Sequence, residues 1–279
     1  MASAVTLGRL GRGARRGPGG PFGRRGRLSA TALGCAALAA LFALPLLALV
    51  VRAFANAWRA PALLPQEYGT RGLKVAFSGR ALEAFGNSLA VGVGVTLAAL
   101  VIGWPAARVL GERRLRRPGL VFLCLAMPLL VPSYATGTGL TEWFLRLNLA
   151  DTLPGLGLAH LVVVLPYCVV VLLSGFGPRV AELEEMGRTM GLGPLARFRL
   201  VTLPAVGPTL AAAAFLGFLV SWSEYGSSLA VGGGRPMLPV VLLPFVRNDP
   251  QVAAALALLF LAPAIAALVV TTRAARSPL

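Results

Sequence analysis

The chain has 279 residues, of which 57% are hydrophobic and only 13% are charged. Average soluble domains carry roughly 25% charged residues, so this composition excludes an ordinary soluble protein and indicates a polytopic membrane protein. The net charge of +16 comes almost entirely from arginine. We assign it to residues that flank membrane spans and not to nucleic-acid binding, because no soluble segment interleaves basic and aromatic residues.

The N-terminal 27 residues are rich in glycine and arginine and show no apolar periodicity, which predicts a disordered basic tail. The apolar run 28–51 is long enough to cross a bilayer. A signal peptide is the alternative, with Ala53-Phe54-Ala55 as a cleavage site. However, the run exceeds the roughly 7–15 apolar residues of a typical signal peptide, so we expect an uncleaved first span.

Five further membrane spans are predicted from apolar runs, at residues 86–110, 118–140, 158–176, 206–228 and 252–272. Within the second span, small residues recur every four positions and would let a neighbouring helix approach closely. These residues are Gly86, Ala90, Gly94 and Ala98. Pro128 and Pro132 are expected to distort the third span, and Pro263 to kink the sixth.

Orientation follows from the basic residues between the spans, which concentrate on the cytoplasmic side of a membrane protein. The arginine-rich turn 112–117 and both termini are then cytoplasmic, whereas the connections 55–85, 141–157 and 229–251 are outside. The prediction is an all-α membrane protein in which residues 28–279 form one domain with six spans, placed in a bacterial cytoplasmic (inner) membrane.

Enzymatic motifs are absent from the sequence. The single lysine, Lys74, lies between Leu73 and Val75, so no phosphate-binding Gly-Lys-Ser/Thr loop exists, and neither HExxH nor GxSxG occurs. We therefore predict no catalytic residues, no metal site and no cofactor. The three cysteines, Cys35, Cys124 and Cys168, fall in apolar runs and are expected to be core residues, and His160 is expected to pack or to lie at the membrane interface.

One carboxylate, Glu224, lies near the outer end of the fifth span, in the stretch SWSEYGSSL. Acidic residues within spans commonly mark a substrate path, which makes Glu224 and the adjacent Tyr225 the candidates for such a path. The alternative is an interfacial position, with Trp222 and Tyr225 in an aromatic belt. No second intramembrane acid or base is evident to form a proton relay.

The segment 178–204 is too polar to span the membrane and too apolar for a free linker. Pro178 begins a helix in which Leu183, Met186 and Met190 form an apolar stripe, and Glu184 is predicted to pair with Arg188. Gly191 is expected to end this helix in a left-handed conformation.

A second short helix is expected to begin at Pro194, with Leu195 and Phe198 on one face, and to end at Pro204. The apolar faces of the two helices need a partner. The bilayer surface and a groove on a cytoplasmic protein both remain open at this point.

The segment resembles the EAA loop of the membrane subunits of binding-protein-dependent ABC importers. That pattern is Glu-Ala-Ala, three residues, Gly, nine residues, an aliphatic residue, one residue and Leu-Pro. Here Glu185 begins the pattern, and Gly191, Val201, Leu203 and Pro204 follow at the corresponding spacing. Six spans, with the loop between the fourth and fifth, also match the family layout over residues 85–275.

One departure from the pattern is the pair Met186-Gly187, where the family usually has two alanines. Glycine disfavours a helix by about 1 kcal/mol relative to alanine, which bears on how stiff this helix is.

The resemblance implies a type I ABC importer permease fold. Residues 178–204 would then couple the spans to a separate ATP-binding subunit, and transport would follow alternating access. The residues that this implies for ATPase coupling are Leu183, Glu185, Met186, Gly187, Met190, Gly191, Leu203 and Pro204. The implied partners are two copies of the ATP-binding subunit, a second permease subunit (this chain or a related one), an extracytoplasmic substrate-binding protein and membrane lipid.

Substrate is suggested by the stretch SWSEYGSSLAVGGG with the following LPVVLLPF, which resembles permeases of the polyamine, thiamine, ferric iron and sulfate/molybdate cluster. The thiamine-type permeases look most similar, and Glu224 would suit thiamine, a polyamine or another small cation. Two other classes compete with this assignment: an ion-coupled secondary transporter, which would carry inverted repeats with broken helices, and a non-transporting membrane scaffold.

Overall fold

The computed structural model describes residues 21–112 and 117–276, with side chains from residue 32 to 275, and these residues are almost entirely helical. The elements in chain order are α1 (Pro21–Ala53), β1 (Ala55–Ala57), β2 (Glu67–Tyr68), α2 (Arg71–Ala76), α3 (Gly79–Gly111), α4 (Pro118–Leu130), α5 (Ser133–Arg146), α6 (Leu153–Leu173), α7 (Pro178–Thr189), α8 (Pro194–Arg197), the π-turn η1 (Phe198–Thr202), α9 (Leu203–Trp222), α10 (Gly226–Val231), α11 (Leu238–Asn248) and α12 (Pro250–Arg276).

Five helical stretches among the described residues are long and apolar enough to cross a membrane, and the pair α4–α5 makes a sixth if it counts as one span. This confirms the all-α membrane class. The distortion expected at Pro132 in the third span is confirmed, because α4 and α5 meet there at an angle of 95°. The break falls at Val131 and Pro132, where the residue before a proline is forced into an extended conformation.

Helix α1 begins at Pro21, so residues 21–27 are helical and not part of a disordered tail as predicted. Arginine is a good helix former and Pro21 is compatible with a first turn, which together let the helix begin before the apolar run. Residues 1–20 of the expected tail lie outside the described residues. The described residues up to Ala48 form one unit, and those from Leu49 onward form a second unit.

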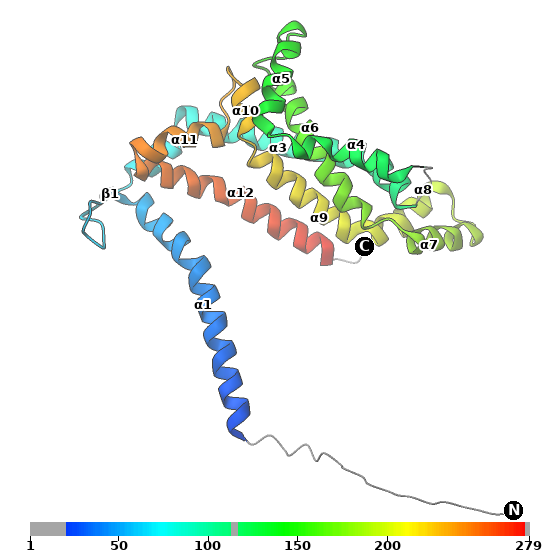
Figure 1. Cartoon of the computed structure of the whole chain (residues 1–279), viewed down its shortest axis with the longest axis horizontal. Helices are drawn as coiled ribbons and strands as arrows, with labels where there is room; N and C mark the ends of the chain where they lie inside the picture. Colours follow the sequence, from blue (N-terminus) through cyan, green and yellow to red (C-terminus); the bar gives the residue numbers. More distant parts are fainter. Residues whose placement is uncertain (1–20, 113–116, 277–279) are drawn as a thin grey trace, which may run out of the picture. The chain divides into compact units, whose positions relative to one another are not determined.

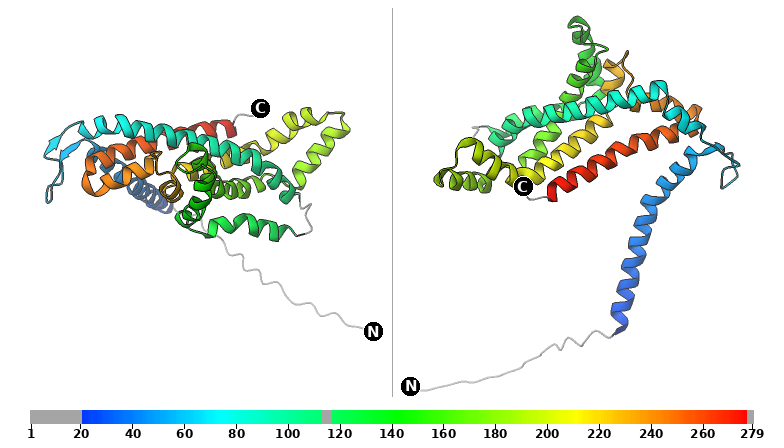
Figure 2. Two further views of the ribbon diagram at one scale, coloured as in Figure 1. Left: turned by 90° about the horizontal axis from the view of Figure 1, so that it is seen from above. Right: turned by 180° about the vertical axis from the view of Figure 1, so that it is seen from behind.

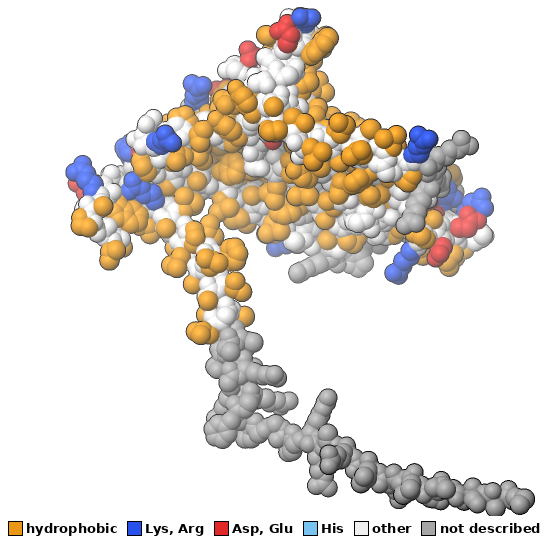
Figure 3. Space-filling view, viewed as in Figure 1, with side chains coloured by type: hydrophobic (Ala, Val, Ile, Leu, Met, Phe, Trp, Pro, Cys, Tyr) orange, Lys and Arg blue, Asp and Glu red, His pale blue; other side chains and the backbone are white. Residues whose placement is uncertain are grey.

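The centre of the second unit consists of α3, α6 and α9, which pack against one another, with α12 against α9 (Figures 1 and 2). Helix α6 starts at Leu153, earlier than predicted, because the Thr152 side chain accepts a hydrogen bond from the Gly155 N–H at 3.1 Å and caps it. Figure 3 shows hydrophobic side chains over the long helices and charged side chains gathered near helix ends, as expected of a protein in lipid.

The small residues that pack inside the chain differ from the predicted ladder. A Cβ atom on Gly86 or Gly94 would meet nothing within 4 Å, so this ladder faces away from the core of the chain. Instead, Gly103 lets α3 approach α6, because a Cβ atom there would lie 2.9 Å from Val169 Cγ2. The glycines of the ladder and the packed glycine Gly103 differ only in the side of α3 that they occupy. Which side faces the protein depends on tertiary structure.

Two of the three cysteines are not core residues, contrary to the prediction. Cys35 and Cys124 are exposed and only Cys168 is buried. An apolar run in a membrane span faces lipid as often as protein, so hydrophobicity does not distinguish the two.

Candidate functional site

Helix α7 ends at a complete Schellman motif. The Leu192 N–H donates to the Gly187 carbonyl and the Gly191 N–H to the Arg188 carbonyl, each at 3.0 Å. Gly191 has φ of +83°, the left-handed conformation that the motif requires. The conformation expected of Gly191 is confirmed, and the motif fixes where α7 stops and how the chain turns toward α8.

The inner face of α7 is formed by Val180, Glu184 and Gly187, which recur at the spacing of one helix face. Val180 packs in a core cluster with Ala107 of α3 and Val206 of α9, and Gly187 is buried. The loop is therefore attached to the spans along one side of α7.

The neighbouring face of α7 carries the predicted apolar stripe. Leu183, Met186 and Met190 are 37%, 60% and 80% exposed. Glu185 is also exposed and pairs with Arg188 at 2.6 Å within the same helix. The outer face of α7 thus presents three apolar side chains and a carboxylate.

Glu184 does not pair with Arg188 as predicted. Its carboxylate binds Arg108 near the end of α3 and accepts a hydrogen bond from the Thr202 hydroxyl in η1. Its side chain is only 11% exposed. Sequence spacing placed Arg188 within reach, but Glu184 lies on the inner face of α7, where partners distant in sequence are closer.

The second helix of the loop does not end at Pro204. Helices α8, η1 and α9 form one continuous stretch, Pro194–Trp222, in which Leu203 and Pro204 are half-buried in the first turn of α9. The Leu203 N–H donates to the Phe198 carbonyl, the wider spacing of a π-turn. This wider turn lies directly before a proline that cannot donate a backbone hydrogen bond.

Gly187 lies on the buried inner face of α7 and not on its outer face. A Cβ atom there would lie 3.3 Å from Leu192 Cδ1 and 3.4 Å from Val201 Cγ2. Both neighbours are side-chain ends that can shift by a few tenths of an ångström.

Gly187→Ala is therefore expected to stabilise α7 by up to about 1 kcal/mol, the propensity difference between alanine and glycine. Gly191→Ala is the matched comparison and is expected to cost about 1 kcal/mol, because φ of +83° strains any residue with a Cβ atom even where space is open. Hydrogen exchange of the α7 amides measures both effects. A Gly187→Ala protein that exchanges faster than the parent would contradict the packing argument.

The fifth span breaks at residues 223–225, between α9 and α10. Glu224 is buried in this break, and its carboxylate accepts a hydrogen bond from the Ser227 N–H at 3.0 Å. Trp222 is 1% exposed, so an interfacial aromatic belt does not describe it. Tyr225 is half-buried.

His160 joins the two halves of the broken span. Its Nδ1 lies 3.0 Å from Ser221 Oγ of α9 and its Nε2 lies 2.9 Å from Ser228 Oγ of α10. Ser228 donates its one hydroxyl proton to the Glu224 backbone carbonyl at 2.6 Å, so its oxygen accepts a hydrogen bond from His160 Nε2–H. The expectation that His160 packs inside the protein is confirmed.

A cavity of about 510 Å³ lies beside this break, between the start of α3, α10 and α11. Ser228 contributes to its wall, and Arg80 and Arg235 are its two charged residues. Neither Glu224 nor Tyr225 lines it. The Asp151 carboxylate accepts a hydrogen bond from the Gly234 N–H, in the connection between α10 and α11, at 3.0 Å.

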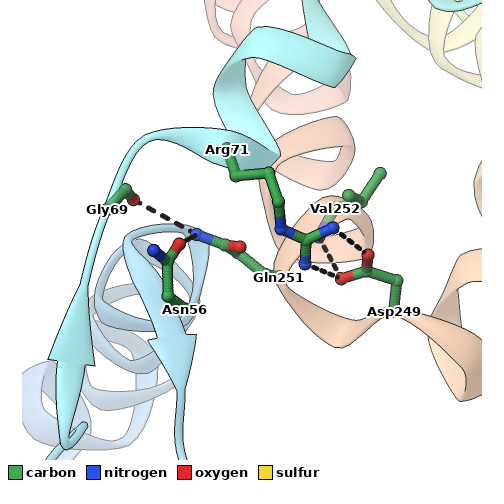
Figure 4. Close-up of polar contacts among 6 residues, drawn as sticks. All are labelled: Asn56, Gly69, Arg71, Asp249, Gln251 and Val252. Atoms are coloured by element: carbon green, nitrogen blue, oxygen red, sulfur yellow. Dashed lines mark hydrogen bonds and ion pairs between the residues drawn. The ribbon is translucent and has the colours of Figure 1, made fainter.

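A second polar network lies at the end of the second unit opposite α7 (Figures 1 and 2). Arg71 binds Asp249 through two hydrogen bonds of 2.6 and 2.9 Å, and Asp249 also accepts from the Val252 N–H at 3.3 Å, capping α12 (Figure 4). Gln251 donates to the side chain of Asn56 at 2.8 Å and to the Gly69 carbonyl at 3.2 Å. The network attaches α2 and both short strands to the start of α12.

Hydrogen bonding to the Arg71 guanidinium lowers the pKa of Asp249 below its usual range. A depressed folded-state pKa means that the charged pair contributes stability above the unfolded pKa, about 3.9, and loses it as the pH falls through the folded value. Since Arg71 is 54% exposed, solvent limits this contribution to roughly 0.5–1 kcal/mol.

Asp249→Asn is expected to lower stability by that amount at pH 7, and the difference from the parent should shrink as the pH falls below about 3.9 and vanish only below the lowered folded-state pKa of Asp249. Asparagine still caps α12, so Asp249→Ala should cost about 1 kcal/mol more at every pH. Thermal unfolding in lipid nanodiscs at pH 7 and at a series of lower pH values below about 3.9 checks this. A pH-independent difference between Asp249→Asn and the parent would rule out the charged pair as its source.

Known proteins provide a separate comparison. No model of a known protein family matches the chain. The molybdenum transport system permease protein ModB of Mycobacterium tuberculosis is 30% identical over 200 residues, covering 66% of this chain and 75% of that protein. The molybdate/tungstate transport system permease protein WtpB of Pyrococcus abyssi is 28% identical over 167 residues, covering 60% and 67%.

The crystal structure of a bacterial ABC transporter involved in import of the acidic polysaccharide alginate contains a chain of the same fold. The TM-score is 0.67 at 18% identity, covering 91% of this chain and 98% of the other. The fold is that of an all-α membrane protein. The chain belongs to the family of ABC transporter permeases, and it is the non-catalytic, multi-pass inner-membrane subunit of an ABC importer.

Several residues of the candidate sites were missed by sequence reasoning. Arg108 and Thr202 bind the inner carboxylate of the loop, and Arg80 and Arg235 line the cavity. A signal existed only for Thr202, which falls inside the EAA pattern next to Leu203. The arginines lie far away in sequence and were interpreted as flanks of membrane spans.

Proposed function

We propose that the α7–α8 loop couples this permease to a separate ATP-binding subunit, with the outer face of α7 seated in a groove on that subunit. The observation that carries this proposal is the exposure of Leu183, Met186 and Met190 on a helix whose other side is fixed to the spans. An amphipathic helix with apolar residues at this spacing is a common groove ligand. The exposed Glu185 supplies a charge for a basic group on the partner.

The remaining assembly follows from the same role. Two ATP-binding subunits, a second permease subunit (this chain or a related one) and an extracytoplasmic substrate-binding protein complete the transporter. Both termini and the α7–α8 loop lie on the cytoplasmic side in this proposal, which agrees with the concentration of arginine there. The network at Arg71 and Asp249 then lies on the opposite side of the membrane.

For the substrate, we propose a small oxyanion. The cavity beside the broken fifth span has two arginines, Arg80 and Arg235, as its charged residues, and guanidinium groups suit oxyanions. The relatives ModB and WtpB are named for molybdenum and for molybdate/tungstate transport. Both fall within the sulfate/molybdate part of the cluster that the sequence resembles.

A small cation such as thiamine or a polyamine is the second candidate, favoured by the buried carboxylate of Glu224 with Tyr225 beside it. The carboxylate already accepts a hydrogen bond from the Ser227 N–H, and neither residue lines the cavity. The oxyanion is therefore the stronger candidate.

Two experiments test these proposals. Purification of the tagged chain from its own membranes in mild detergent should recover an ATP-hydrolysing subunit, and recovery of the chain without any such subunit would refute the coupling role.

Cells that carry the transporter should accumulate molybdate and not thiamine or spermidine. The double variant Arg80→Gln with Arg235→Gln should take up at least tenfold less molybdate. Saturable uptake of thiamine or spermidine that depends on Glu224 would reverse the choice of substrate.

A further inference from the structure

One carboxylate in the α7–α8 loop, that of Glu184, joins three helices. One of its oxygens binds the Arg108 guanidinium on α3, and the other accepts from the Thr202 hydroxyl in η1, the π-turn that leads directly into α9. Thr202 is 1% exposed. Both oxygens of a nearly buried side chain are therefore used, each by a different membrane span.

The partners of Glu184 are themselves held in place. Arg108 also binds Glu112, which directly follows α3, with 2.8 Å between Nε and Oε1, and this contact fixes the plane of the guanidinium. Thr202 is oriented by the π-turn, in which one additional residue enters the helix before Pro204. Turns of this kind occur often at functional positions.

Packing around the carboxylate leaves little room for independent motion. The ring of Trp104 on α3 packs against two other rings. Its centroid lies 5.0 Å from that of Phe176, in the turn before α7, and 5.7 Å from that of Phe198 in η1. A Cβ atom on Gly111 would lie 2.7 Å from Phe176 Cβ, so the end of α3 touches the turn closely. A displacement of α7 must move the ends of α3 and α9 with it or break these contacts.

The outer and inner carboxylates of α7 thus differ in kind. Glu185 is exposed and pairs only within its own helix among the described contacts, whereas Glu184 points into the protein. In the proposed function, the outer face receives the force from the ATP-binding subunit. The contacts of the inner face must then link the displacement of α7 to the spans. Charge-assisted hydrogen bonds are the strongest directional contacts that can make this link.

We infer that Glu184 is a positioning residue that transmits the displacement of α7 to α3, through Arg108, and to α9, through Thr202. This inference rests on the proposed function of α7 as the helix that binds the ATP-binding subunit. It adds to that function a specific internal link, and it names α3 and α9 as the two spans to which α7 is linked.

The test uses the complete transporter, purified with its ATP-binding subunits and placed in nanodiscs. Spin labels at Val101 of α3 and Val270 of α12, which are 74% and 64% exposed, report on span movement by pulsed electron paramagnetic resonance. Three quantities are compared: retention of the ATP-binding subunit, the ATP hydrolysis rate, and the ATP-dependent change in label distance. None of them requires the substrate.

Glu184→Gln keeps the size of the side chain and removes its charge. The variant should retain the ATP-binding subunit and hydrolyse ATP within twofold of the parent, while the ATP-dependent distance change falls at least threefold. Thr202→Val should reduce the change in the same direction, and Thr202→Ser, which restores the hydroxyl, should recover it. Glu142→Gln, at an exposed pair with Arg146 on α5, is the matched control and should have no effect.

The inference is overturned if Glu184→Gln leaves the distance change intact, if the parent shows no change, or if Glu184→Gln releases the ATP-binding subunit, since Glu184 would then only support the docking face. Should Glu184→Gln fail to fold, Thr202→Val against Thr202→Ser decides the question. Failure of the proposed function itself would give a different result. In that case, substitutions that place charged side chains on the outer face of α7 would leave the ATP-binding subunit bound.

Discussion

A protein that carries Met186→Asp together with Met190→Asp is expected to remain folded in the membrane and to lose the proposed ATP-binding subunit. Both side chains are largely exposed and contribute little to the core of the chain, so their loss should not unfold it. In a groove, each would be an anchor whose truncation costs about 2 kcal/mol or more. With 1.4 kcal/mol per factor of ten, the pair should weaken association by at least about 100-fold.

Co-purification and the concentration dependence of ATP hydrolysis measure this effect. Leu63→Asp is the matched control, since Leu63 is 91% exposed in the connection between β1 and β2, at the opposite end of the second unit from α7. It should leave association unchanged. Full retention of the ATP-binding subunit by the double variant would mean that α7 lies on the bilayer surface, the alternative that the sequence left open.

The class of fold could be predicted because it depends on properties local in sequence. Apolar runs of sufficient length, prolines near the third span and the left-handed Gly191 each follow from the residues themselves. The ends of helices were less accurate, since α3 begins at Gly79 and α6 at Leu153, before their apolar runs. Caps and first turns extend a helix beyond the segment that hydrophobicity detects.

The inner contacts of the loop could not be predicted, for a physical reason. Helical periodicity indicates which residues share a face but not which face turns toward the protein. Glu184 and Glu185 are neighbours in sequence, yet the first is nearly buried against Arg108 and the second is exposed beside Arg188. Only the packing of Val180 against α3 and α9 determines the direction.

The broken fifth span illustrates the same limit. A single run of apolar and small residues predicted one helix through Ser228, with Trp222 near its outer end. In the structure the helix ends at Trp222, whose ring lies 5.2 Å from that of Phe260 on α12 and 5.8 Å from that of Phe85 on α3. An aromatic residue near a membrane surface and one that packs three helices together have the same sequence signature.

Trp222→Ala is therefore expected to be the most destabilising single substitution considered for this chain, costing about 3–5 kcal/mol. The side chain is 1% exposed, stacks on Phe218 at 5.6 Å and donates from Nε1 to the Phe260 carbonyl at 3.0 Å. Its removal leaves a cavity among α3, α9 and α12, and lipid outside cannot fill it. Trp222→Phe retains part of the stacking and should cost less.

The matched control is Trp143→Ala on α5, where the tryptophan is 62% exposed and the cost should stay within about 0.5 kcal/mol. Thermal unfolding in nanodiscs compares the three variants, and equal midpoints for Trp222→Ala and Trp143→Ala would refute the packing role. The substitution also reaches the polar cluster, because Ser221, which binds His160, precedes Trp222 in the last turn of α9. In the proposed function, Trp222→Ala should therefore also weaken oxyanion uptake through the cavity that Ser228 lines, even at temperatures where the protein stays folded.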